Sequence, residues 1–231
     1  MGIKASDIDI YEGYTQAESR KFISASLITF GYRIFKSAAV IQNLEELTRF
    51  YVADEATRLD LPNKFPDVLF ESLMDKIRIC ISFENYFKAK LLLNGFIIHE
   101  IDKEKNRHLH KKQKQAPVAV HQLIGGEAFE QLPALKAVLK ETTISFNTLI
   151  CKRAYSKYYN LECSELQFLK DLNEGRNRLH LLISERFSIS KHILSSYRRL
   201  KQLVDVDFAV LQNTLINEFD PSSKSKIPLN F

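Results

Sequence analysis

Three polar residues stand close together in a stretch of the chain that is otherwise apolar and helical in pattern. The stretch is 166–184, and its polar residues are Arg176, Asn177 and His180. At about 100° per helical residue, Arg176 and His180 share one face with several leucines, and Asn177 lies at its edge. An arginine charge on such a face needs a partner or contact with water. Histidine gains and loses a proton near neutral pH, so these residues are the candidates for chemistry.

These residues also have a purely structural explanation. In it, Arg176 bonds a buried carboxylate and His180 is a core histidine whose hydrogen bonds are satisfied. The helical pattern over 67–98 places Glu84 and Lys88 on an apolar stripe. A lysine commonly extends its ammonium group to solvent, and we expect this of Lys88. Glu84 has a shorter reach and needs a partner. We predict that Glu84 pairs with Arg176 across a helix interface.

The composition favours a helical framework for these residues. Hydrophobic residues make up 45% of the 231 positions, and the chain has only 7 Gly and 6 Pro, which indicates few tight turns and long elements. We predict an all-α fold, a mostly antiparallel bundle of about five to seven helices. Thr15 and Ser164 are expected to cap two of them. Helical patterns are expected over 15–56 (unbroken or interrupted near Ser37), 67–98, 134–139, 145–157, 164–184 and 189–218.

We expect one helical domain over 1–231. An irregular lead-in at 1–14 is followed by an N-terminal helical extension at 15–66. The main bundle spans 67–218 and includes a connection at 103–133, with one short helix expected within 116–133. A tail follows at 219–231.

The net charge of +5 is concentrated in the segment 103–115. This basic segment contains one acidic residue, Glu104, and six cationic residues: Lys103, Lys105, Arg107, Lys111, Lys112 and Lys114. A polyanion would be attracted here, although a solvated basic loop would have the same composition. The nearby histidines have no cysteine or carboxylate partners at ligand spacing, so we expect no metal and no cofactor.

The remaining features point to a protein of the cytoplasm without a membrane partner. The cysteines are Cys80, Cys151 and Cys163, an odd number without a CxxC pair, and Cys80 is expected in the core. The chain begins without an apolar leader, and no segment approaches the roughly 20 apolar residues of a membrane span. A reducing compartment is therefore expected.

Two segments together resemble the HEPN superfamily of small helical-bundle proteins, many of which are metal-independent RNases of toxin and anti-phage systems. These are EGRNRLH (174–180) and ISFENYFKAKLLLNGFIIHEID (81–102), and the resemblance covers roughly 70–215. The family signature is an arginine, a polar residue and a histidine after four to six intervening positions. Arg176, Asn177 and His180 match these types, but three residues separate Arg176 from His180 here.

The resemblance implies acid–base cleavage of RNA by a homodimer in which both motifs line one cleft. It implies that His180 takes the proton from the ribose 2′-OH or protonates the leaving 5′-oxygen, and that Arg176 stabilises the phosphorane. Asn177 would orient the phosphate or the histidine, and Glu84 would fix Arg176. The basic segment would guide RNA, and an antitoxin or another defence protein is a possible partner.

Three classes of function remain open from the sequence. The first is a HEPN-type endoribonuclease that acts as a toxin or anti-phage effector. The second is a non-catalytic HEPN-like module that binds nucleotide, nucleic acid or a partner protein, which the short spacing of the motif favours. The third is a helical scaffold in which Arg176 and Glu84 form only a buried ion pair.

Overall fold

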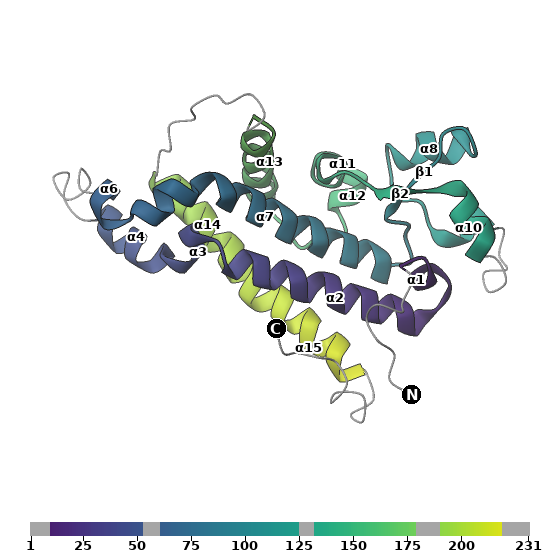
Figure 1. The fold of residues 1–231 in the computed structure, drawn as a ribbon, viewed down its shortest axis with the longest axis horizontal. Helices are drawn as coiled ribbons and strands as arrows, with labels where there is room; N and C mark the ends of the chain where they lie inside the picture. Colours follow the sequence, from purple (N-terminus) through teal and green to yellow (C-terminus); the bar gives the residue numbers. More distant parts are fainter. Residues whose placement is uncertain (1–9, 53–60, 125–131, 179–189, 219–231) are drawn as a thin grey trace. The chain divides into compact units, whose positions relative to one another are not determined.

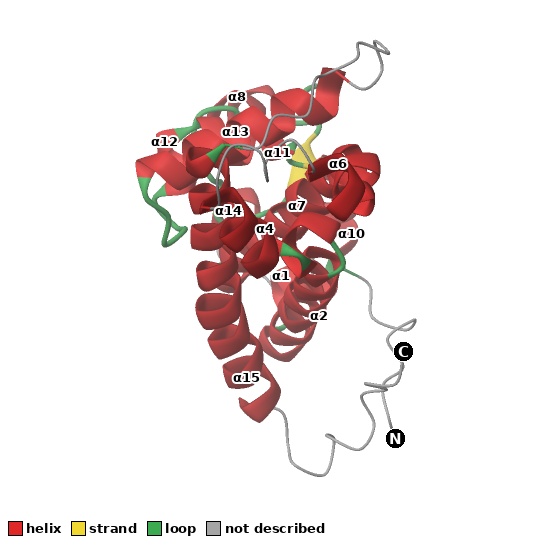
Figure 2. Ribbon diagram, turned by 90° about the vertical axis from the view of Figure 1, so that its left-hand side faces the viewer, coloured by secondary structure: helices red, strands yellow, loops and turns green. Residues whose placement is uncertain are grey.

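The computed structural model describes residues 10–52, 61–124, 132–178 and 190–218, and helices make up most of them (Figure 1). His180 and the predicted tail lie outside the described residues. Figure 2 shows how little of the described chain is strand. In chain order the elements are α1 Glu12–Thr15, α2 Ala17–Lys36, α3 Ala39–Gln42, α4 Leu44–Val52, α6 Leu61–Lys64, α7 Pro66–Leu93, β1 His99–Ile101, α8 Arg107–Gln113, α9 Val120–Ile124, α10 Leu132–Val138, β2 Leu139–Thr143, α11 Phe146–Cys151, α12 Arg153–Ser156, α13 Cys163–Arg178, α14 Lys191–Leu203, the π-helical turn η3 Val204–Phe208, and α15 Ala209–Glu218.

The chain divides into two compact units, each built from segments that are distant in sequence. Unit 1 contains 1–29, 85–160 and 209–231, and unit 2 contains 30–84 and 161–208. The single-domain organisation stays a prediction. No helix among the described residues is long and apolar enough to cross a membrane.

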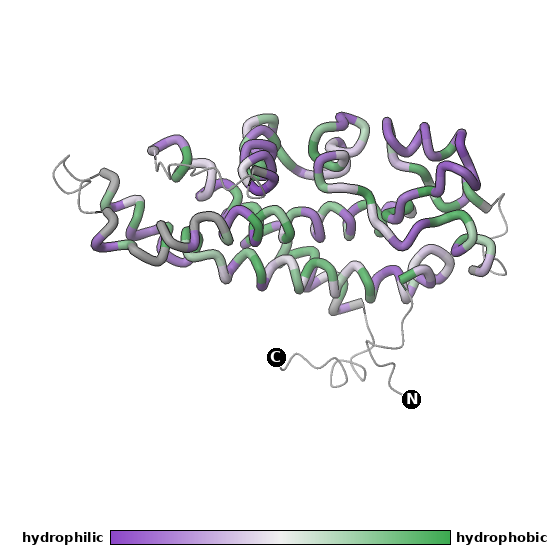
Figure 3. The backbone as a smooth tube through the Cα atoms, turned by 45° about the horizontal axis from the view of Figure 1, so that its top comes forward, coloured by the Kyte–Doolittle hydropathy of each residue, from purple (hydrophilic) through white to green (hydrophobic). Residues whose placement is uncertain are grey.

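Each unit has its own aromatic core. In unit 1, the ring of Phe87 stacks on Tyr159 with 3.8 Å between centroids. In unit 2, the ring of Phe83 meets Phe35 at 6.0 Å and Phe208 at 5.5 Å, both edge to face. The hydropathy colours in Figure 3 show mostly hydrophilic residues along α8 and α13, two helices that carry several of the candidate functional residues.

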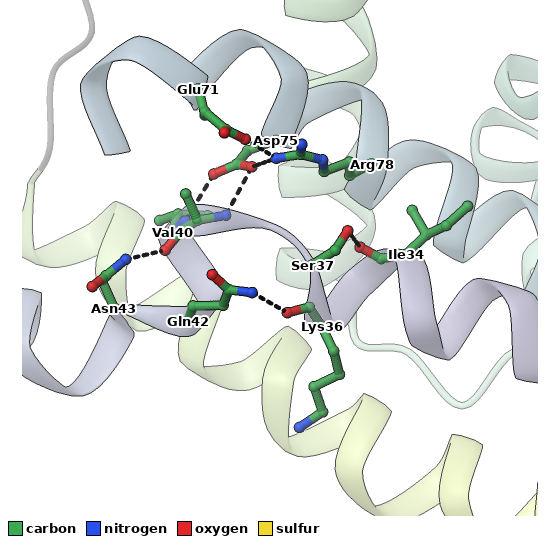
Figure 4. Close-up of polar contacts among 10 residues, drawn as sticks. Ile34, Lys36, Ser37, Val40, Gln42, Asn43, Glu71, Asp75 and Arg78 are labelled. Atoms are coloured by element: carbon green, nitrogen blue, oxygen red, sulfur yellow. Dashed lines mark hydrogen bonds and ion pairs between the residues drawn. The ribbon is translucent and has the colours of Figure 1, made fainter. Parts of the chain in front are cut away.

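Of the two alternatives for the first long helix, unbroken or interrupted near Ser37, the structure shows the interruption. α2 ends at Lys36 and α3 begins at Ala39. The first N–H groups of a helix have no partner within it, and here the buried carboxylate of Asp75 accepts them from Ala39 at 2.9 Å and Val40 at 2.8 Å (Figure 4). Burial raises the pKa of Asp75 against the lowering effect of these bonds and of Arg78. A side chain of α7 thus caps α3.

The expected cap at Thr15 is wrong, because Thr15 is the last residue of α1 and its hydroxyl donates to the carbonyl of Glu12. The neighbouring residue Tyr14 connects this short helix to a distant segment. Its buried hydroxyl accepts the N–H groups of Ile98 (3.0 Å) and His99 (3.1 Å) and lies 2.6 Å from Nδ1 of His99. Tyr14 therefore ties α1 to the start of β1.

Helix α7 ends at Leu93, earlier than the predicted end at 98, because Gly95 adopts a φ of 75°. The N–H of Gly95 donates to the carbonyl of Leu92 at 2.9 Å, and that of Phe96 donates to Leu91 at 3.0 Å. This is the Schellman pattern that commonly ends a helix at a glycine. The residues that follow are released from the helix and enter β1.

A two-stranded sheet corrects the all-α prediction in detail. β1 and β2 pair antiparallel, with His99 opposite Thr143 and Ile101 opposite Leu139, across an irregular register. The connection 103–133 holds the expected short helix, α9, and also α8, which forms within the basic segment. Strand pairing depends on residues about forty positions apart in sequence, so helical periodicity did not reveal it.

The later helices keep their predicted places but are more divided. Ser145 and Ser190 cap α11 and α14 through the N–H groups of Thr148 and Ile193. α11 and α12 are separate helices, and η3 interrupts the last long helix. α13 begins at Cys163, so Ser164 lies within it instead of capping it. The described helices therefore outnumber the five to seven that were predicted.

Candidate functional site

Helix α13 presents the predicted apolar face, which carries Arg176. Leu169 and Leu172 are buried on this face, in agreement with the prediction. The helix start is held by the carboxylate of Glu165, which accepts the N–H of Glu162 at 2.7 Å. The description of α13 ends at Arg178, so the rest of the predicted face lies outside the described residues.

The predicted pairing of Arg176 with Glu84 is confirmed. Nη1 of Arg176 lies 3.9 Å from Oε2 of Glu84 on α7, and the two side chains are 27% and 22% exposed. Both residues belong to unit 2. Asn177 is exposed beside them. The pair is therefore reached by water and does not lie in a dry core, which separates it from the ion pair expected of a scaffold.

Lys76 of α7 also lies at this site, and its place there was not predicted from the sequence. Gly175 is buried within α13, and a Cβ atom there would lie 3.0 Å from both Cδ and Nζ of Lys76. The lysine chain thus passes over the glycine backbone, directly before Arg176 in sequence. Glycine inside a helix costs about 0.5–1 kcal/mol relative to alanine, so an isolated glycine in the helical pattern was the available signal.

Cys80 is a buried residue on which the charges of these side chains act. It is fully buried on α7, which confirms its expected place in the core. Burial raises the pKa of its thiol to about 12, while the charges of Arg176 and Lys76 act to lower the pKa and Glu84 acts to raise it. A thiol with that pKa stays protonated and is a poor nucleophile. The thiol is therefore not a candidate nucleophile at this site.

The expectation that Lys88 extends to solvent is wrong. Its residue is only 8% exposed, and its Nζ donates to Oγ1 of Thr143 at 2.7 Å. Thr143 ends β2, so the lysine reaches the sheet, which had not been predicted. Lys88 and Thr143 both belong to unit 1.

The basic segment is a fixed helix and turn instead of a solvated loop. Gln113, at the end of α8, is buried and bonds β1 twice: its Oε1 accepts the N–H of Ile101 at 2.9 Å, and its Nε2 donates to the carbonyl of His99 at 2.8 Å. Nδ1 of His110 adds a 2.8 Å bond to the carbonyl of Ile101. Asn106 caps the helix start through the N–H of Leu109. The scaffold beneath the cations is thus rigidly held.

All six cationic residues of the basic segment are exposed. Within the described part of the chain, no carboxylate oxygen comes within 4.0 Å of their charged nitrogens. Their positive charge is therefore available to a polyanion. The segment belongs to unit 1, whereas Arg176 and Glu84 belong to unit 2.

The described residues hold no group of three or more His, Cys, Asp and Glu side chains that could bind a metal ion. His99 and His110 are instead engaged by Tyr14 and the carbonyl of Ile101.

No family model matches the chain, and neither a curated protein nor a solved structure matches it.

Proposed function

We propose that the protein is a metal-independent endoribonuclease of the HEPN type, acting as a homodimer in a toxin or anti-phage system. The observation that carries this proposal is the partly exposed pair of Arg176 and Glu84, with exposed Asn177 beside it. The mostly helical architecture supports a HEPN-like bundle. A buried arginine would serve only the fold, whereas an arginine at the surface can bind a phosphate.

In the proposed reaction the ribose 2′-oxygen attacks the neighbouring phosphorus while the bond from phosphorus to the 5′-oxygen breaks. His180 takes the 2′-OH proton or delivers a proton to the leaving oxygen. Arg176 stabilises the negative charge of the phosphorane, and Asn177 orients the phosphate or the histidine. Glu84 holds the guanidinium in place. Each of these roles is filled by a side chain, so the proposed reaction requires no metal.

The basic segment is proposed to guide RNA. Its fixed backbone supports this role, because α8 is clamped to β1 and holds exposed cations without the need to order the backbone on binding. An antitoxin or another defence protein is the proposed natural partner of the active enzyme.

RNA cleavage by the purified full chain, in the presence of EDTA, tests the proposed function. Single-stranded and structured RNAs are incubated with wild type, His180→Ala and His121→Ala, and folding is compared by circular dichroism. His121 is an exposed histidine of α9 in unit 1, so its variant controls for the loss of an imidazole. We expect cleavage by wild type and His121→Ala but not by His180→Ala.

Two results would overturn the nuclease. The first is cleavage that persists in His180→Ala or stops with EDTA. The second is RNA binding without cleavage by any of the three proteins, which would identify the non-catalytic binding module that the short spacing between Arg176 and His180 also fits.

A further inference from the structure

Two aromatic rings of unit 1 lie together and are both partly exposed. Phe96 follows the end of α7, and Tyr158 follows α12. Their ring centroids are 4.8 Å apart, and the ring planes are tilted by 60°. Neither residue is buried, so the pair keeps contact with solvent. An aromatic pair of this kind can stack against a further flat ring system.

A short backbone bridge connects this aromatic pair to the basic segment. Phe96 pairs antiparallel with Ala119, which follows the basic segment in the chain. Oε1 of Gln122 accepts the N–H of Ala119 at 3.3 Å and also a hydrogen bond from Nζ of Lys112 at 3.1 Å. One amide oxygen thus holds the ammonium group of Lys112 beside the backbone that pairs with Phe96.

A second cation, Lys157, adjoins the pair, with its Nζ 5.0 Å from the centre of the Tyr158 ring. The hydroxyl of Tyr155 fixes this part of the chain to the end of α8, because it donates to the carbonyl of Gln113 at 2.5 Å. Lys112 and Lys157 are both exposed. Among the residues that the structure describes, no carboxylate oxygen lies within 4.0 Å of either ammonium group. Both positive charges are therefore open to an anion.

We propose that Phe96 and Tyr158 stack on the bases of single-stranded RNA, whose phosphates are bound by Lys112 and Lys157. Aromatic side chains beside cations bind single strands with little regard to sequence, because every base has a π-face. The bases of a duplex are paired and stacked inside the helix and do not reach such rings. The pair therefore selects single strands. This inference rests on the proposed function for its ligand, and it adds contacts to bases where the basic segment supplies only charge.

A fluorescence titration of the full chain tests the stacking directly. The chain has no tryptophan, so Tyr158→Trp introduces one indole at the site. His180→Ala is the background, so that cleavage does not interfere. Phe30→Trp is the matched reporter, because Phe30 is an exposed aromatic residue of α2 in unit 2. We expect oligouridine to quench the indole at 158 but not at 30, and inorganic polyphosphate, which has no bases, to quench neither.

Affinities of the same background protein separate the stacking from the charge. Tyr158→Leu should weaken oligouridine binding by roughly five-fold or more, the loss of one base stack, without changing its salt dependence. Tyr158→Phe keeps the ring and should bind nearly as tightly as the background. Lys157→Gln should make the slope of log affinity against log salt shallower by about 0.7, the value for one phosphate contact on a single strand. Lys191→Gln, an exposed lysine of α14 in unit 2, should change neither quantity.

The inference is overturned if oligouridine leaves the fluorescence of Tyr158→Trp unchanged, or if Tyr158→Leu binds as tightly as Tyr158→Phe. It is also overturned if duplex RNA binds as tightly as the single strand, or if the background protein binds no RNA. Cleavage by the wild-type chain is measured in parallel. RNA cleavage without quenching at 158 would keep the proposed function and remove this inference, whereas quenching without cleavage would do the reverse.

Discussion

Arg176 and Glu84 approach to 3.9 Å between Nη1 and Oε2 while both side chains keep about a quarter of their surface in water, at 27% and 22%. A fully buried pair would have to be compensated at every polar atom. At this site, solvent water can hydrogen-bond the polar atoms of the pair. The fold can therefore tolerate changes at the site that would be severe in a core.

The first prediction concerns the stability of Arg176→Ala. Because solvent screens the pair, we expect a loss of only about 1 kcal/mol in the free energy of unfolding, measured by urea titration. Arg199→Ala is the matched control, since Arg199 lies 4.0 Å from Glu162 in an exposed pair. A loss of about 3–5 kcal/mol would instead indicate a buried structural ion pair.

The second prediction concerns the end of α7 at Gly95. Its φ of 75° is a left-handed conformation that alanine adopts with strain. We expect Gly95→Ala to lower the free energy of unfolding by about 1 kcal/mol and Gly95→Asn to lower it less, because asparagine tolerates this conformation better. The neighbouring Asn94→Ala tests for a general effect of changing the loop. Equal losses for alanine and asparagine at 95 would contradict the conformational explanation.

The third prediction concerns the clamp beneath the basic segment. Gln113→Ala leaves the N–H of Ile101 and the carbonyl of His99 without their side-chain partner, so we expect a loss of about 2–4 kcal/mol in the free energy of unfolding. Gln115 is exposed two residues later, and Gln115→Ala should change stability by less than about 0.5 kcal/mol. Similar losses for the two variants would show that the clamp does not stabilise the fold.

The fourth prediction concerns pH and the aspartate of the π-helical turn. Burial raises the pKa of Asp205, but its bonds to Lys201 (2.6 Å) and Lys36, together with their charges, leave the pKa below its usual value of 3.8. A carboxylate with a lowered pKa in the folded state stabilises the protein above its unfolded pKa. This contribution is lost as the pH falls through the folded pKa.

Asp205→Asn should therefore be less stable than wild type by about 1 kcal/mol or less near pH 7, since the pair is partly exposed. The difference should shrink as the pH falls below 3.8 and through the lowered pKa of the folded state. Thermal unfolding of both proteins across this pH range measures it. A difference that is the same in acid and at neutral pH would exclude the ionic contribution.

The helices were predictable where a local pattern repeats within one segment. The apolar face of α13 follows from periodicity, whereas for the helix over 15–56 periodicity left open whether it is interrupted near Ser37. Glu84 and Arg176 were each recognisable as a charge on an apolar face, and each therefore needed a partner. The positions of both residues on regular helices made their pairing predictable as well.

Contacts between distant segments were decided by the tertiary structure. Lys88 was expected in solvent because no helical pattern reveals that β2 ends beside it with Thr143. Lys76 was not identified because a lysine on a helix is usually a solvated residue, and only the packing of α7 on α13 brings it over Gly175.

By itself, the sequence determined a helical chain, the charges that interrupt its apolar faces, and the basic segment, because residue type and spacing act locally. Only the tertiary structure decided that 99–101 pairs with 139–143 as a sheet, that α8 is clamped to that sheet, and which side chains surround Arg176. These features depend on contacts whose two halves lie tens of residues apart, and neither half carries a signal of the other.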